Sequence, residues 1–200
     1  MPLAGNNMQL PYNIILASNS PRRRELLAGL GLDFTVKVID GIDESWPQEL
    51  KGEDIPLYIS REKAAPYRKL MGPKDLVITA DTIVYVDGQV LGKPHDKADA
   101  RRMLQLISGR WHEVITGVTL MTARGERSFA VTTRVKFCNL TESEIESYVE
   151  SGQPMDKAGA YGIQEWIGYV GVEAIEGSYF NVVGLPVQRL YRELTDFCNQ

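Results

Sequence analysis

Short apolar runs and amphipathic stretches follow one another along the chain from residue 13 onward. An apolar run bounded by turn residues is typical of a buried strand, whereas apolar residues three and four positions apart are typical of a helix. Strands are predicted at 13–18, 34–39 and 179–183, hairpins at 76–91 and at 113–122 with 128–137, and helices at 21–29, 56–70, 99–107, 141–149 and 186–197. Because strands and helices alternate while hairpins intervene, the pattern predicts an α/β fold with a mixed twisted sheet and flanking helices.

Turn and capping residues support several of these elements. Ser20 can cap the first helix with Pro21 in its first position, and Gly29 or Gly31 ends that helix. The pair Asp87-Gly88 is typical of the turn of a hairpin.

Later stretches contain residues typical of helix ends and of loops. Thr141 and Glu144 form a capping box at the start of a helix, and Pro66 should bend or end the helix 56–70. Residues 152–177 are rich in glycine and short on periodicity, so we expect functional loops there rather than scaffold.

Composition narrows the class of protein. The chain has 200 residues, of which 44% are apolar, so it can fill a core, and we expect a single α/β domain over 13–200. The net charge of −4 argues against broad electrostatic binding of nucleic acid. No stretch approaches the roughly 20 apolar residues of a membrane span. Residues 1–12 lack the pattern of a signal peptide, and we expect a disordered or loosely held leader. A cytoplasmic protein without nucleic-acid or membrane partners is therefore predicted.

The end of the first strand carries a candidate anion site. Ser18 and Ser20 follow the apolar run, and Arg22 and Arg23 lie in the first turn of the next helix. Free backbone N–H groups at a helix start, together with arginines, suit a phosphate chain. We expect Arg22 and Arg23 to face inward, and the alternative is a solvated basic turn.

Asp81 interrupts an apolar strand and is the leading candidate for a catalytic or metal-binding residue. An acid inside a strand needs a partner, a metal or a cleft. It could be a general base or a ligand of a divalent cation, and Asp43 and Glu44 in the acidic stretch 40–54 could supply further oxygen ligands. The alternative for Asp81 is a structural aspartate, and the alternative for Asp43 and Glu44 is a plain acidic loop.

Lys63, Lys93 and Gln164 are further polar candidates. Lys93 lies between Gly92 and Pro94, which restrict the backbone, and Gln164 could pair with the edge of a base. For most lysines a solvated surface position is the ordinary interpretation. His112, at the start of a predicted strand, is more often structural than ligating.

These blocks together resemble the Maf family of nucleoside triphosphate pyrophosphatases, in family order and over nearly the whole chain after Asn13. The matching blocks are Ser18 to Arg23, Arg61 to Ala64, Ala80-Asp81-Thr82, Gly92-Lys93-Pro94, Ser108-Gly109 to Thr116-Gly117, Asp156 to Gln164, and Gly177-Ser178-Tyr179 to Gly184-Leu185-Pro186. The resemblance implies hydrolysis of a nucleoside triphosphate to the monophosphate and diphosphate with a divalent cation, Mg or Mn. It also implies an elongated two-lobed subunit with a central cleft, and a homodimer.

The resemblance also implies roles for individual residues. Asp81 matches the proton acceptor of the family. Positions tied to substrate choice correspond to Arg22, Thr82 and Gln164, and positions around the phosphates and metal correspond to Arg23, Glu44, Lys63 and Lys93. Ser18 is a further candidate for binding the substrate. Asp81 and Glu44 would hold the cation, while Lys63 and Lys93 would act in catalysis.

The block from Asp156 to Gln164 has the form of the dTTP/UTP branch, so we expect dTTP and UTP, and modified pyrimidine nucleotides, as substrates. Three alternatives stay open. The first is a 7-methyl-GTP-type pyrophosphatase of the same family, and the second is a non-catalytic nucleotide sensor in cell-division control. The third is a nucleic-acid-binding module, against which the acidic balance weighs.

Overall fold

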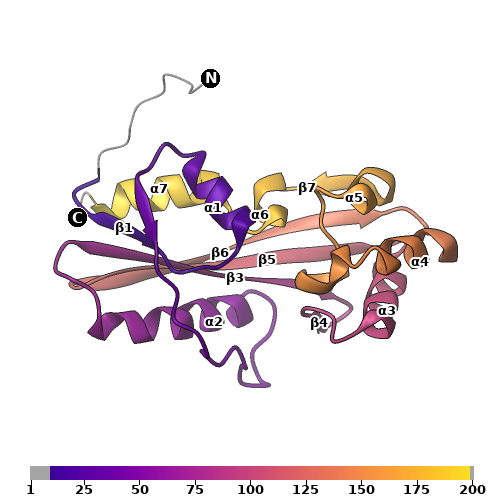
Figure 1. Ribbon diagram of the computed structural model, residues 1–200, viewed down its shortest axis with the longest axis horizontal. Helices are drawn as coiled ribbons and strands as arrows, with labels where there is room; N and C mark the ends of the chain where they lie inside the picture. Colours follow the sequence, from indigo (N-terminus) through magenta and orange to yellow (C-terminus); the bar gives the residue numbers. More distant parts are fainter. Residues whose placement is uncertain (1–9, 199–200) are drawn as a thin grey trace. The chain divides into compact units, whose positions relative to one another are not determined.

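The fold of residues 10–198 is described by a computed structural model (Figure 1). Its sheet has the strand order β2-β1-β3-β5-β6-β7, with β4 paired to β3. β1 runs parallel to β2 and β3, whereas the pairs β3–β4 and β6–β7 are antiparallel. The strands are β1 (Asn13–Leu16), β2 (Phe34–Val36), β3 (Asp75–Val86), β4 (Gln89–Leu91), β5 (Trp111–Thr122), β6 (Gly125–Phe137) and β7 (Val172–Glu176). The prediction of a mixed sheet is therefore confirmed.

The α-helices are α1 (Pro21–Ala28), α2 (Asp54–Ala64), α3 (Lys97–Ile107), α4 (Glu142–Glu150), α5 (Trp166–Gly171), α6 (Tyr179–Val183) and α7 (Val187–Cys198). Three short 3₁₀ helices are η1 (Ala65–Lys69), η2 (Gln153–Asp156) and η3 (Ala158–Ala160). As predicted, α2 ends just before Pro66 and Thr141 and Glu144 form a capping box at α4. None of the helices within 10–198 is long and apolar enough to cross a lipid bilayer.

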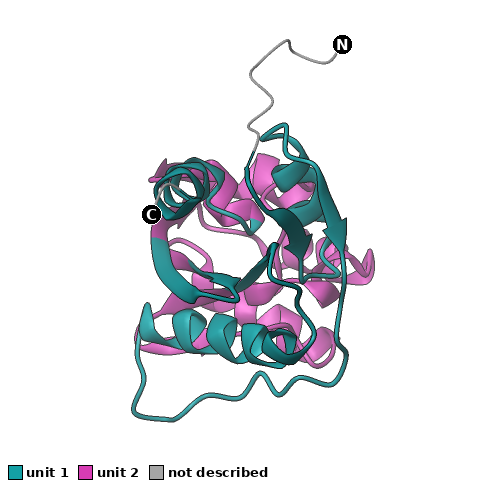
Figure 2. Ribbon diagram, turned by 90° about the vertical axis from the view of Figure 1, so that its left-hand side faces the viewer, with its two compact units in different colours: residues 1–81, 116–131, 184–200 teal, residues 82–115, 132–183 magenta. Residues whose placement is uncertain are grey.

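The chain forms two compact units, which Figure 2 shows in different colours. Among the described residues, the first unit contains 10–81, 116–131 and 184–198, and the second contains 82–115 and 132–183. The prediction of one domain over 13–200 stays a prediction. Of the predicted leader 1–12, residues 1–9 lie outside the described residues, while Leu10 and Tyr12 pack against the core of the first unit.

In the first unit, helices cover both faces of the strands (Figure 1). Leu27 of α1 and Leu190 and Leu194 of α7 pack on one face, in a cluster with Leu16 and Ile78 of β1 and β3. On the opposite face, Ala64 and Tyr67 of α2 and η1 pack with Ile15, Val77 and Met121. Burying such side chains supplies about 1.5–3 kcal/mol each, so both helix layers are held to the strands by apolar contacts.

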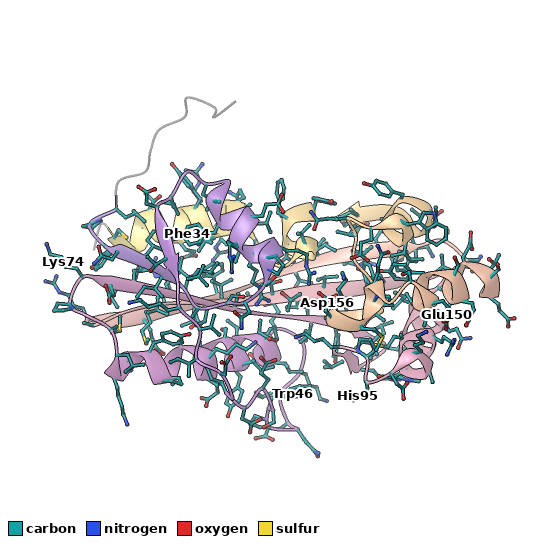
Figure 3. The ribbon with its side chains drawn as sticks, viewed as in Figure 1. Phe34, Trp46, Lys74, His95, Glu150 and Asp156 are labelled. Carbon is teal, nitrogen blue, oxygen red and sulfur yellow. The ribbon has the colours of Figure 1, made fainter. Side chains whose placement is uncertain are left out.

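In the second unit, α3 presents the predicted apolar face. Ala100, Met103, Leu104 and Ile107 are all buried. Along the exposed side of α3, Arg101 pairs with Glu146 and Glu150 of α4, and Glu150 is labelled in Figure 3. These exposed ion pairs contribute little stability, about 0–1 kcal/mol each.

Two predictions about the C-terminal third are wrong. Residues 179–183 form α6 rather than a strand, because a run of five residues shows no decisive periodicity. The Ser178 hydroxyl accepts from the Asn181 N–H at the start of this helix, and the Asn181 amide donates to the Val114 carbonyl. The stretch 152–177 contains η2, η3, α5 and β7 rather than loops, and each piece is too short to show a period.

Candidate functional site

Lys63 lies between two carboxylates in the first unit. Its Nζ is 2.8 Å from Asp81 Oδ1 and 3.0 Å from Glu44 Oε1. The Asp81 side chain is 11% exposed, whereas that of Glu44 is 57% exposed. The three residues come from β3, from α2 and from the loop between β2 and α2, so the fold brings together three positions far apart in sequence.

A close contact between α2 and β5 places Lys63. A side chain at Gly117 would lie 2.3 Å from the backbone of Pro56, so the helix approaches the strand as closely as glycine allows. One turn further along the helix, the Thr79 hydroxyl donates to the Ser60 carbonyl at 2.6 Å, and the Ser60 hydroxyl lies 2.9 Å from Thr119 Oγ1. Such hydrogen bonds contribute about 1 kcal/mol each and fix the helix on the strand.

This register explains the pairing of Lys63 with Asp81. Residues 60 and 63 lie on one face of a helix, and residues 79 and 81 lie on one face of a strand. Ser60 of α2 contacts Thr79 of β3. About one turn further along the helix and two residues further along the strand, Lys63 therefore contacts Asp81.

The loop that carries Glu44 is tied down at its start. The Tyr67 hydroxyl donates to the Lys37 carbonyl at 2.8 Å and accepts from the Ile39 N–H at 3.0 Å. Further along, Asp43 accepts from the backbone and hydroxyl of Ser45, which lowers the pKa of the Asp43 carboxyl. Trp46, labelled in Figure 3, continues this loop beyond Glu44. Asp43 is therefore committed to shaping the loop, while Glu44 reaches Lys63.

The turn between β1 and α1 has the predicted cap. Ser20 caps the helix by accepting from the Arg23 N–H, and the buried Ser18 accepts from the Ser20 N–H at 3.2 Å. Arg22 and Arg23 are half-buried and Arg24 is exposed. The inward direction expected for Arg22 and Arg23, and not for Arg24, agrees with this pattern.

Arg23 holds two backbone carbonyls. Its Nε donates to Gly184 O at 2.9 Å and its Nη1 donates to Ala80 O at 2.8 Å. Loss of hydration on burial lowers the pKa of the Arg23 guanidinium, the charge of Arg22 lowers it further, and Asp81 and Glu44 oppose this lowering. Arg23 thus fixes the residue just before Asp81 and contributes charge to the same region.

The first unit therefore gathers Arg23 and Lys63 about the carboxylates of Asp81 and Glu44, and the charge of Arg22 acts on Arg23. A lysine ammonium has three N–H donors, and within residues 10–198 Lys63 donates one hydrogen bond, to Asp81 Oδ1, and forms an ion pair with Glu44 Oε1. Asp81 Oδ2 accepts no hydrogen bond from the described residues, so one oxygen of this carboxylate remains available.

The two carboxylates are suited to a hard cation. Both have an oxygen within ion-pair distance of the same Nζ, so these oxygens lie no further apart than the sum of the two contacts. Mg²⁺ is commonly held by one or two carboxylates together with substrate phosphates rather than by a complete protein cage. Residues 10–198 contain no group of three or more His, Cys, Asp or Glu side chains that could bind an ion alone. The donor set thus fits a cation shared with a phosphate ligand.

Thr82, Lys93 and Gln164 belong to the second unit. Thr82 is half-buried, and Lys93 and Gln164 are exposed. The Gly159 N–H donates to Gly92 O at 3.0 Å, which joins the loop of Lys93 to the segment that ends at Gln164. Their predicted cooperation with the cluster of the first unit stays a prediction.

Sequence reasoning missed a second charged cluster in this unit. The buried Lys157 donates to the Gln153 carbonyl at 2.7 Å and to Asp156 Oδ1 at 2.5 Å, and it pairs with Glu165 Oε1 at 2.8 Å. The signal available was a lysine between two acids, Asp156 at the start of the block from Asp156 to Gln164 and Glu165 just after it.

His112 is buried, and its Nε2 lies 2.7 Å from the hydroxyl of the buried Tyr161. Burial lowers the pKa of His112 to about 4. The ring is therefore neutral at pH 7, which is consistent with a structural residue.

The mixed sheet and the cations gathered about two carboxylates describe an α/β protein with a candidate site for a phosphate ligand and a cation. The family model described as Maf-like protein matches residues 13–197. The chain belongs to the Maf family.

The chain is 61% identical over 183 residues to a protein of Phocaeicola vulgatus named dTTP/UTP pyrophosphatase, covering 92% of this chain and 95% of the relative. A protein of the same name from Porphyromonas gingivalis is 50% identical over 188 residues, covering 93% of this chain and 94% of the relative. Among solved structures, a HAM1 protein from Coxiella burnetii matches with a TM-score of 0.50 at 15% identity, covering 92% of this chain and 99% of that one. The last match supports the fold alone.

Proposed function

We propose that this protein is a nucleoside triphosphate pyrophosphatase that hydrolyses dTTP and UTP to the monophosphate and diphosphate. The observation that carries the proposal is Lys63 between Asp81 and Glu44, next to the arginines of α1. Relatives at 61% and 50% identity named dTTP/UTP pyrophosphatase support the same substrates.

In this proposal the cations bind the triphosphate. Arg22 and the remaining N–H of Lys63 would contact phosphate oxygens and stabilise the negative charge that develops on the leaving diphosphate. Arg23 is held by the carbonyls of Ala80 and Gly184, so it acts by position and by charge. The hydroxyl of Ser18 and the N-terminal end of the α1 dipole would complete the anion site.

Asp81 would accept the proton of the attacking water. The water oxygen forms a bond to the α-phosphorus, the bond from that phosphorus to the bridging oxygen breaks, and the proton goes to the free Oδ2 of Asp81. A divalent cation, Mg or Mn, would be held by Asp81 and Glu44, and when bound it would orient the phosphates and neutralise their charge. Lys63 would keep the two carboxylates together.

The remaining roles rest on the resemblance alone. Thr82 and Gln164, together with Arg22, would select the base, and Lys93 would act on the phosphates. The enzyme would work as a homodimer in the cytoplasm.

The test is a panel of nucleoside triphosphates incubated with the purified protein and Mg²⁺ or Mn²⁺, with released diphosphate and monophosphate both measured. In ¹⁸O-labelled water the label should appear in the monophosphate, because the water attacks the α-phosphorus. The proposal fails if diphosphate is not released. It also fails if GTP or 7-methyl-GTP is cleaved faster than dTTP and UTP, and tight binding without release would favour a sensor.

A further inference from the structure

The segment that ends at Gln164 is closed into a ring by residues outside the predicted site. Lys157 stands before the segment 158–164 and Glu165 after it, and their ion pair of 2.8 Å joins the two ends. Tyr148 of α4 reinforces this closure, because its hydroxyl donates to Glu165 Oε2 and accepts from the Gly162 N–H at 3.1 Å. Each end of the segment and its middle are thus held by one network.

Protein oxygens surround the ammonium of Lys157. It donates hydrogen bonds to the Gln153 carbonyl and to Asp156 Oδ1, and its Nζ forms an ion pair with Glu165 Oε1. The residue is also only 8% exposed. Lys157 is therefore built to hold protein groups in place rather than to bind a ligand.

The ring holds a strained backbone. Ala160 has a φ of 58° and is fully buried, a conformation that costs on the order of 1–3 kcal/mol for a residue other than glycine. Gly159 next to it has a φ of 68°, and an added side chain there would lie 2.7 Å from Val84. Such a conformation persists only where the surroundings impose it, and here these surroundings include Lys157, Glu165 and Tyr148.

The same turn fixes the loop of Lys93. The Gly159 N–H donates to the carbonyl of Gly92, the residue before Lys93. At the other end of the ring, Gln164 precedes Glu165 and is exposed. The two residues that the resemblance ties to phosphate and base thus both depend on the conformation of 158–164.

We propose that Lys157 is a positioning residue for substrate selection: its ion pair with Glu165, supported by Tyr148, sets the placement of Gln164 and of the Lys93 loop. The inference rests on the proposed function and assigns Lys157, Glu165 and Tyr148 a role in it. Loss of this closure would let Gln164 take several conformations, and discrimination between bases would fall while the chemistry about Asp81 continued.

The test compares Lys157→Met with Lys157→Arg and with the control Lys97→Met. Lys97 is an exposed lysine of the same unit, whose ion pair with Glu150 lies at the surface. The measured quantities are kcat and KM for dTTP, UTP and GTP, at a temperature where circular dichroism shows each variant folded.

In Lys157→Met we expect kcat/KM for dTTP relative to GTP to fall about tenfold or more, since small misplacements of a positioning group are costly. Lys157→Arg should restore most of this ratio, and Lys97→Met should leave it unchanged. Where Lys157→Met does not fold, Tyr148→Phe removes two hydrogen bonds at lower cost and should reduce the ratio in the same direction.

Hydrogen exchange gives a second reading that needs no substrate. The amides of Gly159 and Gly162 should exchange faster in Lys157→Met, and amides of α2 should not. An unchanged preference for dTTP in a folded, active variant would overturn the positioning role, and so would unchanged exchange at these amides. A wild-type protein that releases no diphosphate would instead refute the proposed function itself, so the two failures are distinct.

Discussion

Two lysines in this protein each lie against two carboxylates, and they differ in what they leave open. Lys63 contacts Asp81 and Glu44, which come from distant parts of the first unit. Lys157 of the second unit contacts its sequence neighbour Asp156 and the nearby Glu165, and it also donates to the Gln153 carbonyl. Within the described residues, the Nζ of Lys157 contacts three protein oxygens, whereas that of Lys63 contacts two.

This difference distinguishes a lysine that can bind a ligand, Lys63, from a lysine that holds protein groups in place, Lys157. A buried lysine surrounded by three protein oxygens stabilises one conformation, because any change leaves a charge or a carboxylate unpaired. A lysine with a donor to spare, beside an aspartate with a free oxygen, can take up a phosphate without breaking its existing contacts. An ion pair in a structure is therefore informative about function only when all its donors and acceptors are counted.

The largest effect should come from the carboxylate of the first cluster. Asp81→Asn removes the proposed proton acceptor and one cation ligand while keeping the shape of the side chain, so turnover of dTTP should fall about 10²–10⁴-fold. Diphosphate release by the purified variant measures this, and circular dichroism should show an unchanged fold. Asp87→Asn, the same change in the hairpin turn that follows the strand of Asp81, serves as the control. Full activity of Asp81→Asn would remove the assignment.

The same substitution at the two lysines should reduce stability by different amounts. Lys157→Met leaves the largely buried Glu165 without its cation, and we expect the free energy of unfolding to fall by about 3 kcal/mol. In Lys63→Met the loss should be smaller, about 2 kcal/mol, because the charge of Arg23 still acts on the similarly buried Asp81. The turnover of Lys63→Met should nevertheless fall about 100-fold or more. Urea denaturation and dTTP hydrolysis measured on both variants check this, and equal losses of stability would break the comparison.

Acid should weaken the second unit through His112. Burial lowers the pKa of His112 to about 4. Between pH 6.5 and 4 the unfolded chain binds a proton that the folded chain does not, so stability falls as the pH falls through this window and is fully present above it. From pH 7.5 to pH 5 the contribution of this residue should be a loss of about 2 kcal/mol.

Urea denaturation at both pH values measures this loss. In His112→Gln the difference between the two pH values should shrink by that amount, whereas in His95→Gln, at the exposed histidine, it should persist. Identical pH dependence in the wild type and in His112→Gln would contradict the assignment.

The smallest effect should come from the exposed partner of Lys63. Glu44→Gln keeps the loop, which Asp43 and Tyr67 shape, but weakens one proposed ligand of the cation. The Mg²⁺ concentration that gives half-maximal activity should rise about tenfold. Asp43→Asn, one residue earlier in the same loop, is the matched control and should change this concentration less. A larger change in Asp43→Asn than in Glu44→Gln would contradict the assignment of Glu44 as the ligand of the cation.

Much of the fold could be predicted because its elements carry local signals. The capped helices, the hairpin at Asp87 and the buried face of α3 each follow from residues within a few positions of one another. The short pieces after residue 152 could not be predicted in this way. The apolar side chains among residues 179–183 suit a strand and a helix equally well. Asn181 contacts Val114 and Thr133, which lie in distant segments, so these contacts are not visible in the local sequence.

The candidate site shows the same division. Its residue types, an acid in a strand and arginines at a helix start, are visible in the sequence and carry the likeness to the Maf family. The partner of each residue is not visible in the sequence. Lys157, for example, lies inside the block from Asp156 to Gln164, but its contacts with Gln153 and Glu165 appear only in the structure.

By itself the sequence determined which elements form and which chemical groups are present, because capping, periodicity and turn formation act over a few residues. Only the tertiary structure decided that Lys63 meets Asp81 and Glu44, because that meeting depends on the approach of α2 to Gly117 and on the bond between Thr79 and Ser60. Contacts of this kind join residues far apart in the chain, and their geometry is set by packing that no local pattern encodes.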